Sequence, residues 1–410
     1  MKTAIPELRK NRIMEKVPAE EIHQRLKKFQ TVLATHNCDG AFLFQNVDIF
    51  YFSGTIQSSI LFIPTQGDPV LMVQKGFQRV KEECPLKNII AVNGKSHLPG
   101  TLHDFGIRRI DRVGIEMDVL PAQLYLWLAE TFPQCGFADV SGLIRKQRMI
   151  KSLYELDQIR KAATILHQGY MEIQGFIKEG VSELEIDGRL GFIARREGHM
   201  GILRMRGWNQ EMTYAHVLSG ESGSVVSFLN SPHGGSGNTP AMAQGAGFRR
   251  IRKNEPIGID YGVGINGYLA DQFRTFVIGD LPPDLERAHR CSRDLHDLFA
   301  REAKPGVPCP DLYAMAKEFA RSAGLSDCFM GHGEGQVRFI GHGIGLEIDE
   351  FPVIAPNFEE KLAQGMVMAF EPKFVFPGKG VVGMEDDYLV TSSGVERLTL
   401  TEQVLIKVKP

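Results

Sequence analysis

The sequence lacks closely spaced cysteines and an excess of charge of either sign. Its six cysteines are scattered and form no Cys-x-x-Cys motif, which argues against a thiolate zinc site and, in a chain of 410 residues, against a disulfide framework. The 47 basic and 49 acidic residues leave a net charge of −2. A nucleic-acid or anionic-membrane partner would require a strong basic excess, so we expect neither.

Long apolar runs are also absent. No stretch of about 18 apolar residues occurs, so we expect no transmembrane helix. The first residues, MKTAIPELRKNRIMEKVP, are too charged to hold the apolar segment of a signal peptide. These features predict a cytoplasmic location.

The chain is long enough for two domains, and we place the boundary at the basic stretch 145–148. Residues 1–148 are typical of a small α/β domain without a phosphate-binding glycine loop. Helical periodicity and short apolar runs predict helices at 20–36 and 122–132 and strands at 41–45, 49–54, 58–64, 69–74, 87–92 and 112–117.

Residues 149–410 contain one pattern twice, namely two helices, glycine-rich loops and a hairpin-like segment. The capping boxes Ser152-x-x-Glu155 and Ser182-x-x-Glu185 predict the first two helices. The second pair is predicted around 284–303 and 310–323, and the hairpins at 258–279 and 366–391. This repetition predicts a duplicated half-domain with pseudo-two-fold symmetry.

Each hairpin carries two acidic residues in apolar surroundings. Asp260 and Asp271 lie on opposite arms of the first turn, and Glu371 and Glu385 on opposite arms of the second. Adjacent strands are roughly 5 Å apart, so these carboxylates can share one site. Buried carboxylates need partners, and two divalent cations would turn their repulsion into coordination.

His342 is the fifth candidate ligand, because the flanking glycines of GHGIG let the backbone approach closely and leave the imidazole free. Oxygen-rich coordination with a single imidazole suits Mn²⁺, Co²⁺, Fe²⁺ or Zn²⁺. Each residue also has an ordinary structural interpretation: a strand aspartate as a salt-bridge or turn residue, the histidine as a loop cap, and Glu371 as a strand-end charge. The joint order of the five favours a metal centre.

These motifs resemble the pita-bread metallopeptidase family, M24, which includes methionine aminopeptidase, aminopeptidase P, prolidase and the metal-free relative creatinase. The resemblance is carried by DYGVGINGYLADQFRTF, GHGIGLE, GMVMAFEP and GVVGMEDDYLVT, and by the junction-like RMIKSLYELDQIRKAA. It implies a small creatinase-like N-terminal α/β domain (1–148) followed by a pseudo-two-fold pita-bread catalytic domain (149–410), an α/β plus α+β architecture.

The resemblance also implies a function. Asp260, Asp271, His342, Glu371 and Glu385 would bind two divalent ions, Mn²⁺ first and Co²⁺, Zn²⁺ or Fe²⁺ as alternatives, with Asp271 and Glu385 bridging. The family's nucleophile is a metal-bridging hydroxide, and Glu371 would shuttle the proton. The N-terminal domain points to Xaa-Pro dipeptidase or aminopeptidase P, to short proline-containing peptides as substrates, and to a homodimer.

The chain departs from the family pattern at two places. Asp349 stands where the proline-directed enzymes usually have a histidine, and the loop 216–240 is longer than usual. We expect His233, with His216 as the second choice, to be the substrate-side histidine. We expect Asp349 to lie beside the metal ligands, accepting a hydrogen bond from substrate or pairing with Arg274 or Arg338. Arg274 is itself a further candidate for the substrate side of the site.

Three alternatives stay open at the level of sequence. A lyase of the dimethylsulfoniopropionate type uses the same scaffold to break a C–S bond, and the two departures keep this possibility alive. Creatinase-type amidinohydrolysis is disfavoured because the ligands are retained. A non-catalytic binding protein on a peptidase fold is disfavoured by the intact ligands and the absence of basic tails.

Overall fold

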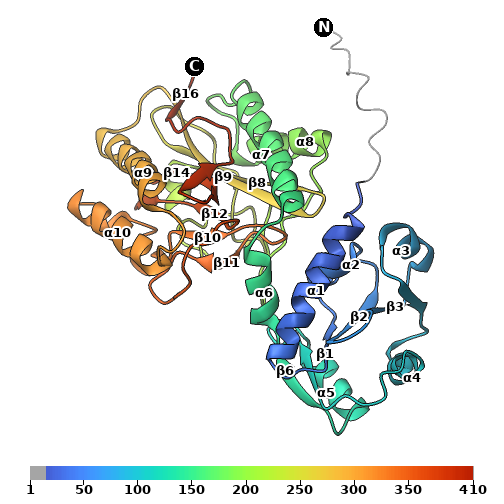
Figure 1. Cartoon of the computed structure of the whole chain (residues 1–410). Helices are drawn as coiled ribbons and strands as arrows, with labels where there is room; N and C mark the ends of the chain where they lie inside the picture. The colour runs from blue at the N-terminus through green and yellow to red at the C-terminus, as the bar shows by residue number, and fades with distance from the viewer. Residues whose placement is uncertain (1–14, 410) are drawn as a thin grey trace. The chain divides into compact units, whose positions relative to one another are not determined.

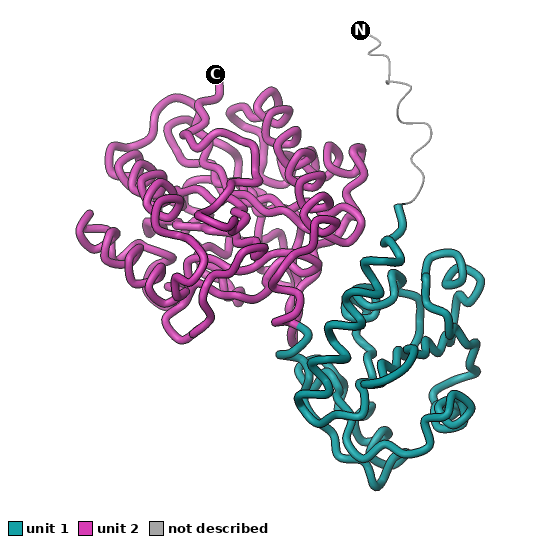
Figure 2. Tube along the Cα trace, viewed as in Figure 1, with its two compact units in different colours: residues 1–144 teal, residues 145–410 magenta. Residues whose placement is uncertain are grey.

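The computed structural model describes residues 15–409 and divides the chain into two compact units, which meet in sequence between Ile144 and Arg145 (Figure 2). The division falls inside helix α6 (Ser141–Met149), slightly before the boundary drawn from sequence. Each unit has its own sheet and its own hydrophobic core.

The first unit is a six-stranded mixed sheet with helices packed on it (Figure 1). The strand order is β4-β3-β2-β1-β5-β6, antiparallel from β3 to β1 and parallel elsewhere. Helix α1 packs on β1 and β2 because its apolar stripe (Ile22, Leu26, Phe29, Leu33) is buried. The elements are α1 (Ala19–Thr35), β1 (Gly40–Leu43), α2 (Asn46–Ser53), β2 (Ser59–Pro64), β3 (Val70–Val73), α3 (Phe77–Glu83), β4 (Asn88–Ala91), α4 (Leu98–Asp104), β5 (Arg112–Ile115), α5 (Ala122–Thr131) and β6 (Gly136–Asp139).

One predicted strand is wrong: residues 49–54 belong to helix α2. The side chain of Gln45 caps this helix by accepting hydrogen bonds from the amides of Val47 and Asp48. Gly54 ends it in the left-handed conformation. The aromatic residues that suggested a strand lie in this helix, where most of them are buried. Local capping and tertiary burial therefore override strand propensity here.

The second unit contains a ten-stranded sheet whose main path is β11-β10-β12-β14-β9-β8-β7. Both predicted capping boxes are present, at the starts of α7 and α8. The elements are α7 (Leu153–Ile173), α8 (Glu183–Glu197), β7 (Ala215–Ser219), β8 (Ile257–Ile265), β9 (Tyr268–Ile278), α9 (Pro283–Glu302), α10 (Cys309–Ser322), β10 (Gly341–Gly343), β11 (Glu350–Val353), β12 (Val367–Phe370), β13 (Lys373–Phe376), β14 (Gly380–Val390), β15 (Val395–Arg397) and β16 (Ile406–Val408).

Two helix pairs divide the second unit into halves, as the repeated sequence pattern predicts. Helices α7 and α8 share a core with β7, β8 and β9, whereas α9 and α10 share a second core with β12, β13 and β14. The central pairing of β14 with β9 joins the halves (Figure 1).

A buried ion cluster fixes the loop between β10 and β11, which carries Asp349. Arg148 donates to Glu347 at 2.8 Å and to Glu350 at 2.5 Å, and Lys151 donates to Glu350 at 2.7 Å. Glu350 also accepts the amides of Leu346 and Glu347. Burial alone would raise the pKa of Glu350, but Arg148 and Lys151 outweigh it and lower the pKa to about 2.

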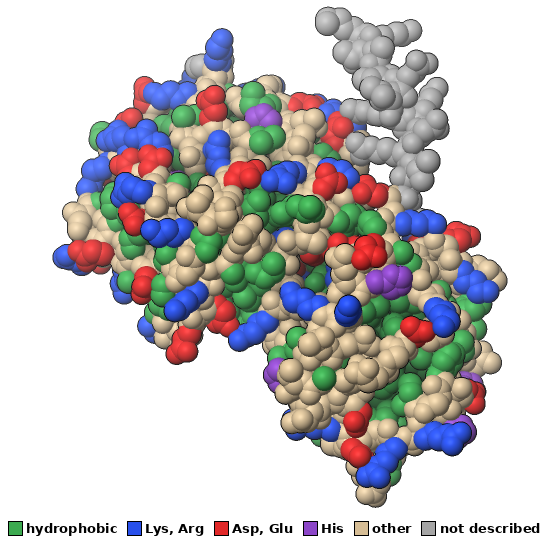
Figure 3. Space-filling view, in the orientation of Figure 1, with side chains coloured by type: hydrophobic (Ala, Val, Ile, Leu, Met, Phe, Trp, Pro, Cys, Tyr) green, Lys and Arg blue, Asp and Glu red, His purple; other side chains and the backbone are tan. Residues whose placement is uncertain are grey.

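The surface carries charges of both signs. On the face shown in Figure 3, Lys and Arg side chains lie among Asp and Glu side chains, in agreement with the near-balanced composition. Among the described residues, no helix is both long and apolar enough to cross a bilayer.

The buried cluster yields a stability prediction. Arg148→Met leaves Glu347 and Glu350 without their shared guanidinium, and we expect it to lower the free energy of unfolding by about 3–5 kcal/mol in urea denaturation. Lys146→Met removes a surface ion pair with Glu360 and should change the free energy of unfolding by less than about 1 kcal/mol. Because the pKa of Glu350 is lowered, its contribution is complete above the unfolded pKa near ~4.3 and is lost as the pH falls toward about 2. Equal stability of the two variants at pH 7 would contradict this role.

Candidate metal centre

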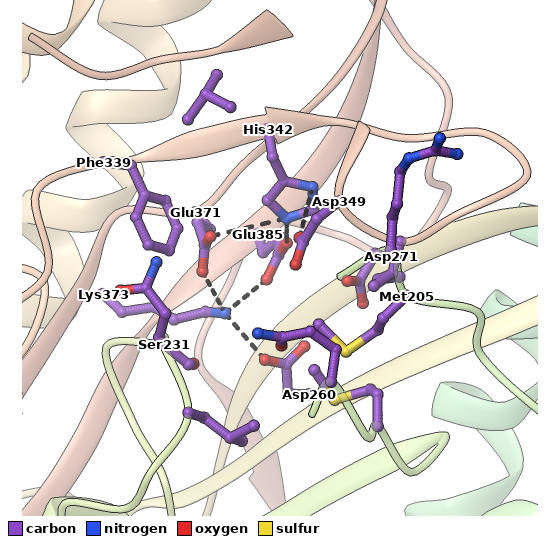
Figure 4. Close-up of a pocket in the computed structure, with 17 residues that line it drawn as sticks. Met205, Ser231, Asp260, Asp271, Phe339, His342, Asp349, Glu371, Lys373 and Glu385 are labelled. Carbon is purple, nitrogen blue, oxygen red and sulfur yellow. Dashed lines mark hydrogen bonds and ion pairs between the residues drawn. The ribbon is translucent and has the colours of Figure 1, made fainter. Parts of the chain in front are cut away.

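The five predicted ligands line one cavity of about 230 Å³ in the second unit (Figure 4). They reach it from strands β8, β9, β10 and β14 and from the residue after β12. The cavity is also lined by three further charged residues, Arg206, Asp349 and Lys373, and by other side chains of the loop 205–212. The convergence expected from sequence is therefore present.

The register of the first hairpin brings its two aspartates to one face. Asp260 pairs with Phe273 across the β8–β9 ladder, and Gly262 pairs with Asp271. The two aspartates are thus diagonal neighbours on the same side of the ladder. Gly262 has no side chain opposite Asp271, and a Cβ there would lie 2.6 Å from Leu203 Cδ1, so a larger residue would have to displace this leucine side chain.

The second pair of carboxylates comes from the other half of the unit. Glu385 lies on β14, opposite Phe273 of β9, which brings it beside the first hairpin. Glu371 follows the last residue of β12, where its amide donates to Ile340 O at 3.0 Å. Both side chains are buried. Figure 4 shows their carboxylates pointing toward His342 and Lys373.

His342 lies between two close strands. A Cβ at Gly341 or at Gly343 would collide with the carbonyl oxygen of Ala369 or of Phe351, which explains the flanking glycines. Its Nε2 lies 3.7 Å from Glu371 Oε1 and 3.8 Å from Glu385 Oε1. The Nδ1 of His342 is hydrogen-bonded to the carbonyl oxygen of Gly343, at 3.1 Å, which leaves Nε2 for the carboxylates.

Asp349 lies beside this imidazole. Its Oδ1 is 3.4 Å from His342 Nδ1, and 53% of its side chain is exposed. Among the described residues, His342 is the ion-pair partner of Asp349, and the expected pairing with Arg274 or Arg338 is not observed. The negative charge of Asp349 helps Glu385 and Glu371 to raise the pKa of His342 well above its usual value, against the effect of burial.

The unexpected member of the site is Lys373, which follows Glu371 by two residues. Its Nζ donates to Asp260 Oδ2 at 3.0 Å, Glu371 Oε2 at 2.9 Å and Glu385 Oε2 at 2.6 Å (Figure 4). The sequence contained a signal for it, because side chains two apart in an extended segment lie on the same face. The motif that predicts the ligand, GMVMAFEP, ends at Pro372 and therefore does not include the lysine.

The pKa values of the carboxylates divide the site into two ends. At one end, Lys373 outweighs burial and holds the pKa of Asp260 well below its usual range. At the other end, burial and the charges of Glu385 and Asp260 raise the pKa of Asp271 well above its usual range. Burial also raises the pKa of Glu371, to about 7, although Lys373 opposes the shift. Negative charge is thus balanced near Asp260 and in excess near Asp271.

The two candidate substrate-side histidines do not line the main cavity: His233 lies in a loop, but His216 lies on β7, where it pairs with Asp260. His233 Nε2 is 3.0 Å from Asp260 Oδ2, and His216 Nε2 is 3.1 Å from Gln244 Oε1. Both rings are buried, and burial lowers the pKa of each, to about 4 for His216. His216, His233 and Asp260 place one ligand atom each within 4.8 Å of one another, as do Asp271, His342 and Glu385.

Arg274 is not positioned to meet a substrate. It is fully buried, and its guanidinium donates to Asp386 and to the backbone oxygens of Phe273, Glu385, Thr401 and Glu402. These contacts use its available N–H groups. The prediction of a substrate-side role for Arg274 is therefore wrong. Its side chain ties β9 to β14 and to the C-terminal segment.

Comparisons with known proteins agree with this geometry. The profile of Metallopeptidase family M24 matches residues 157–392, and that of the Creatinase/Prolidase N-terminal domain matches residues 25–150. The chain belongs to metallopeptidase family M24. The predicted fold class, a creatinase-like N-terminal domain followed by the catalytic domain, and the prediction of a hydrolase of this family are thereby confirmed, and the family implies divalent metal ions.

The chain is similar over nearly its whole length to members of this family. It is 26% identical to an Xaa-Pro dipeptidase of Pyrococcus furiosus over 389 residues, covering 93% of this chain and 99% of the relative. The prolidase structure from Pyrococcus horikoshii matches with a TM-score of 0.79 at 25% identity, covering 93% of this chain and all of that one. An Xaa-Pro dipeptidase structure from Bacillus anthracis shares the fold, with a TM-score of 0.80, 24% identity, and coverage of 94% and 99%.

The side chains present fit one divalent ion better than two. Asp271, His342, Glu371 and Glu385 offer an oxygen-rich donor set with one imidazole, which suits a first-row divalent metal ion. The carboxylates around Asp260 do not fit a second ion in the same way. The Lys373 ammonium lies within hydrogen-bond distance of the oxygens that this ion would need.

We predict that Asp271→Ala abolishes metal-dependent hydrolysis while the protein stays folded. Loss of an outer partner of a metal ligand already costs about 10–100-fold in metal affinity or activity, so loss of a ligand should cost at least as much. Metal content, kcat/KM and Tm would be measured together. Asp280→Ala, in which an exposed aspartate loses its surface partner Lys407, is the matched control. Unchanged metal content and activity in a folded Asp271→Ala protein would refute the assignment.

Proposed function

We propose that this chain hydrolyses the peptide bond before proline in short peptides with a free N-terminus, and Xaa-Pro dipeptides in particular. The observation that carries the proposal is the convergence of four carboxylates and one imidazole in a cavity of an M24 chain. The Pyrococcus furiosus relative, matched over 99% of its length, is named an Xaa-Pro dipeptidase.

The size of the cavity supports a small substrate. Pockets for drug-sized ligands have volumes of roughly 300–1,000 Å³, and this cavity measures about 230 Å³. A dipeptide is a ligand of suitable size, whereas a folded polypeptide is not. We therefore favour a dipeptidase over an enzyme that trims long peptides.

The side chains divide the work of hydrolysis. A divalent ion bound by Asp271, His342, Glu371 and Glu385 supplies a more acidic water molecule and polarises the substrate carbonyl. Glu371, at the cavity wall, accepts a proton and delivers it to the leaving proline nitrogen. Asp349, half-exposed at the same wall, accepts a hydrogen bond from the substrate's α-ammonium group. His233 keeps Asp260 oriented from behind.

Four finer predictions from sequence belong to this proposal. Mn²⁺ is the first choice of metal, with Co²⁺, Zn²⁺ and Fe²⁺ as alternatives. The bridging of two ions by Asp271 and Glu385 depends on how many ions the site takes, which Lys373 affects. A homodimer and a cytoplasmic location stay predictions.

A substrate panel tests the proposed reaction. With added Mn²⁺, we expect Xaa-Pro dipeptides to give a higher kcat/KM than Xaa-Ala dipeptides, Xaa-Pro tripeptides or N-acetylated Xaa-Pro. Loss of a charged hydrogen bond of about 1.5–3 kcal/mol corresponds to about 10–100-fold for the acetylated substrate. Dimethylsulfoniopropionate is included as the rival substrate. Its cleavage, with no hydrolysis of any peptide, would replace the peptidase proposal by the lyase.

Asp349 yields a separate prediction about substrate choice. Asp349→Ala should raise KM for free Xaa-Pro dipeptides more than it weakens metal binding, because the carbonyl of Gly343 still accepts a hydrogen bond from His342 Nδ1. Asp349→His should narrow the difference between free and N-acetylated substrates, since the negative charge is gone. Metal affinity and KM would be measured on the same preparations. Loss of metal with an unchanged substrate ranking would show that Asp349 serves His342 alone.

A further inference from the structure

The ammonium group of Lys373 lies at the meeting point of three carboxylates. Asp260, Glu371 and Glu385 each present one oxygen to Nζ, at 3.0, 2.9 and 2.6 Å. An ammonium group has three N–H donors, so each donor has one carboxylate partner. Figure 4 shows the three contacts radiating from the nitrogen.

The fold holds this side chain in place. Lys373 is the first residue of β13 and pairs with Gly383 of β14. A Cβ at Gly383 would lie 2.9 Å from Lys373 Cα and 3.3 Å from Cγ, so this glycine leaves room for the lysine. The Nζ also lies 4.9 Å from the centre of the Phe273 ring, and the lysine side chain is 1% exposed. The ammonium is thus a built-in part of the cavity wall.

A divalent ion cannot share this position. Ions of the first transition row bind carboxylate oxygens at about 2.0–2.2 Å, so an ion held by the same three oxygens would lie almost on top of Nζ. Two cations at that separation would clash sterically and repel each other. The end of the site at Asp260 is therefore filled by the protein itself.

The opposite end keeps a complete set of donors. Glu371 and Glu385 use Oε2 for the ammonium and present Oε1 at 3.7 and 3.8 Å from His342 Nε2. Asp271 places a ligand atom within 4.8 Å of those of His342 and Glu385. Ligand atoms around one ion at about 2.1 Å stand roughly 3–4 Å apart, so these donors need only a small contraction.

We propose that Lys373 replaces one of the two metal ions, so that each chain binds a single divalent cation at Asp271, His342, Glu371 and Glu385. The inference rests on the metal-ligand set of the proposed function but not on its substrate. With the ammonium built into the wall, one divalent ion brings the positive charge to three for four carboxylates, whereas two ions would bring it to five.

Metal stoichiometry tests the proposal. Chelator-treated wild-type protein is titrated with Mn²⁺ by calorimetry, and bound metal is counted by elemental analysis after dialysis. We expect one ion per chain and the electron paramagnetic resonance spectrum of isolated Mn²⁺. Lys373→Ala removes the ammonium and opens its space, and we expect two ions and a spin-coupled pair. Lys373→Arg keeps the charge and should remain at one.

Controls separate this inference from its neighbours. Lys379→Ala, which changes an exposed lysine in the turn of the same hairpin, should bind one ion like the wild type. Two ions in the wild type, or none, would overturn the proposal, and this measurement holds even where Lys373→Ala fails to fold. One ion in a folded Lys373→Ala protein would also overturn it. One ion in a wild-type protein that cleaves no Xaa-Pro peptide would refute the substrate proposal and leave this one standing.

Discussion

Repulsion among Asp260, Asp271, Glu371 and Glu385 is the constraint on which the geometry of the second unit depends. Two unit charges 4 Å apart interact by about 4 kcal/mol at an effective dielectric constant of 20, so four clustered carboxylates require positive charge nearby. Lys373 supplies part of it from within the fold. At the other end, burial and the neighbouring carboxylates raise the pKa of Asp271 well above its usual range, and there a metal ion has its physical reason to bind.

Phe273 links the halves of the site. Across the sheet it lies opposite Asp260 on one side and opposite Glu385 on the other, so a single residue of β9 sets the separation of two carboxylates. Its ring lies 4.9 Å from Lys373 Nζ and packs edge-on against His233 at 5.5 Å. An aromatic face attracts a cation, so the ring supports the ammonium where hydrogen-bonding groups are already used. The position of the cation thus follows from the register of β9.

The sequence predicted the parts of the fold that depend on local pattern. Capping boxes and amphipathic spacing predicted helices α7 and α8, and turn residues between strand-like segments predicted both hairpins. These signals arise within a few residues of the chain. The strand predicted at 49–54 failed because Gln45 and Gly54 define a short helix whose aromatic residues are buried in tertiary contacts. The prediction for Arg274 failed for a related reason: its partners outside β9 lie more than one hundred residues away, and spacing along the chain cannot reveal them.

The candidate site was predictable as a set of donors but not as a balance of charge. The four acidic residues on the two hairpins suggest two divalent ions. Lys373, which changes this charge balance, lies one residue beyond the motif GMVMAFEP. Its effect is visible only when three oxygens from β8, β14 and the end of β12 are seen around one nitrogen.

An internal ammonium also changes how the site is organised before metal binds. Without any cation the carboxylates would repel each other and move apart, and an incoming ion would have to gather them. Lys373 already holds Asp260, Glu371 and Glu385 within 3.0 Å of one point, so two of the four donors at the Asp271 end are fixed in advance. A preorganised site loses less free energy to reorganisation on binding. The replacement of a metal ion by Lys373 has a limit, because a single positive charge replaces a double one. The ammonium, unlike a metal ion, can coordinate no atom of the substrate. Chemistry at this site is thereby confined to the end formed by Asp271 and His342.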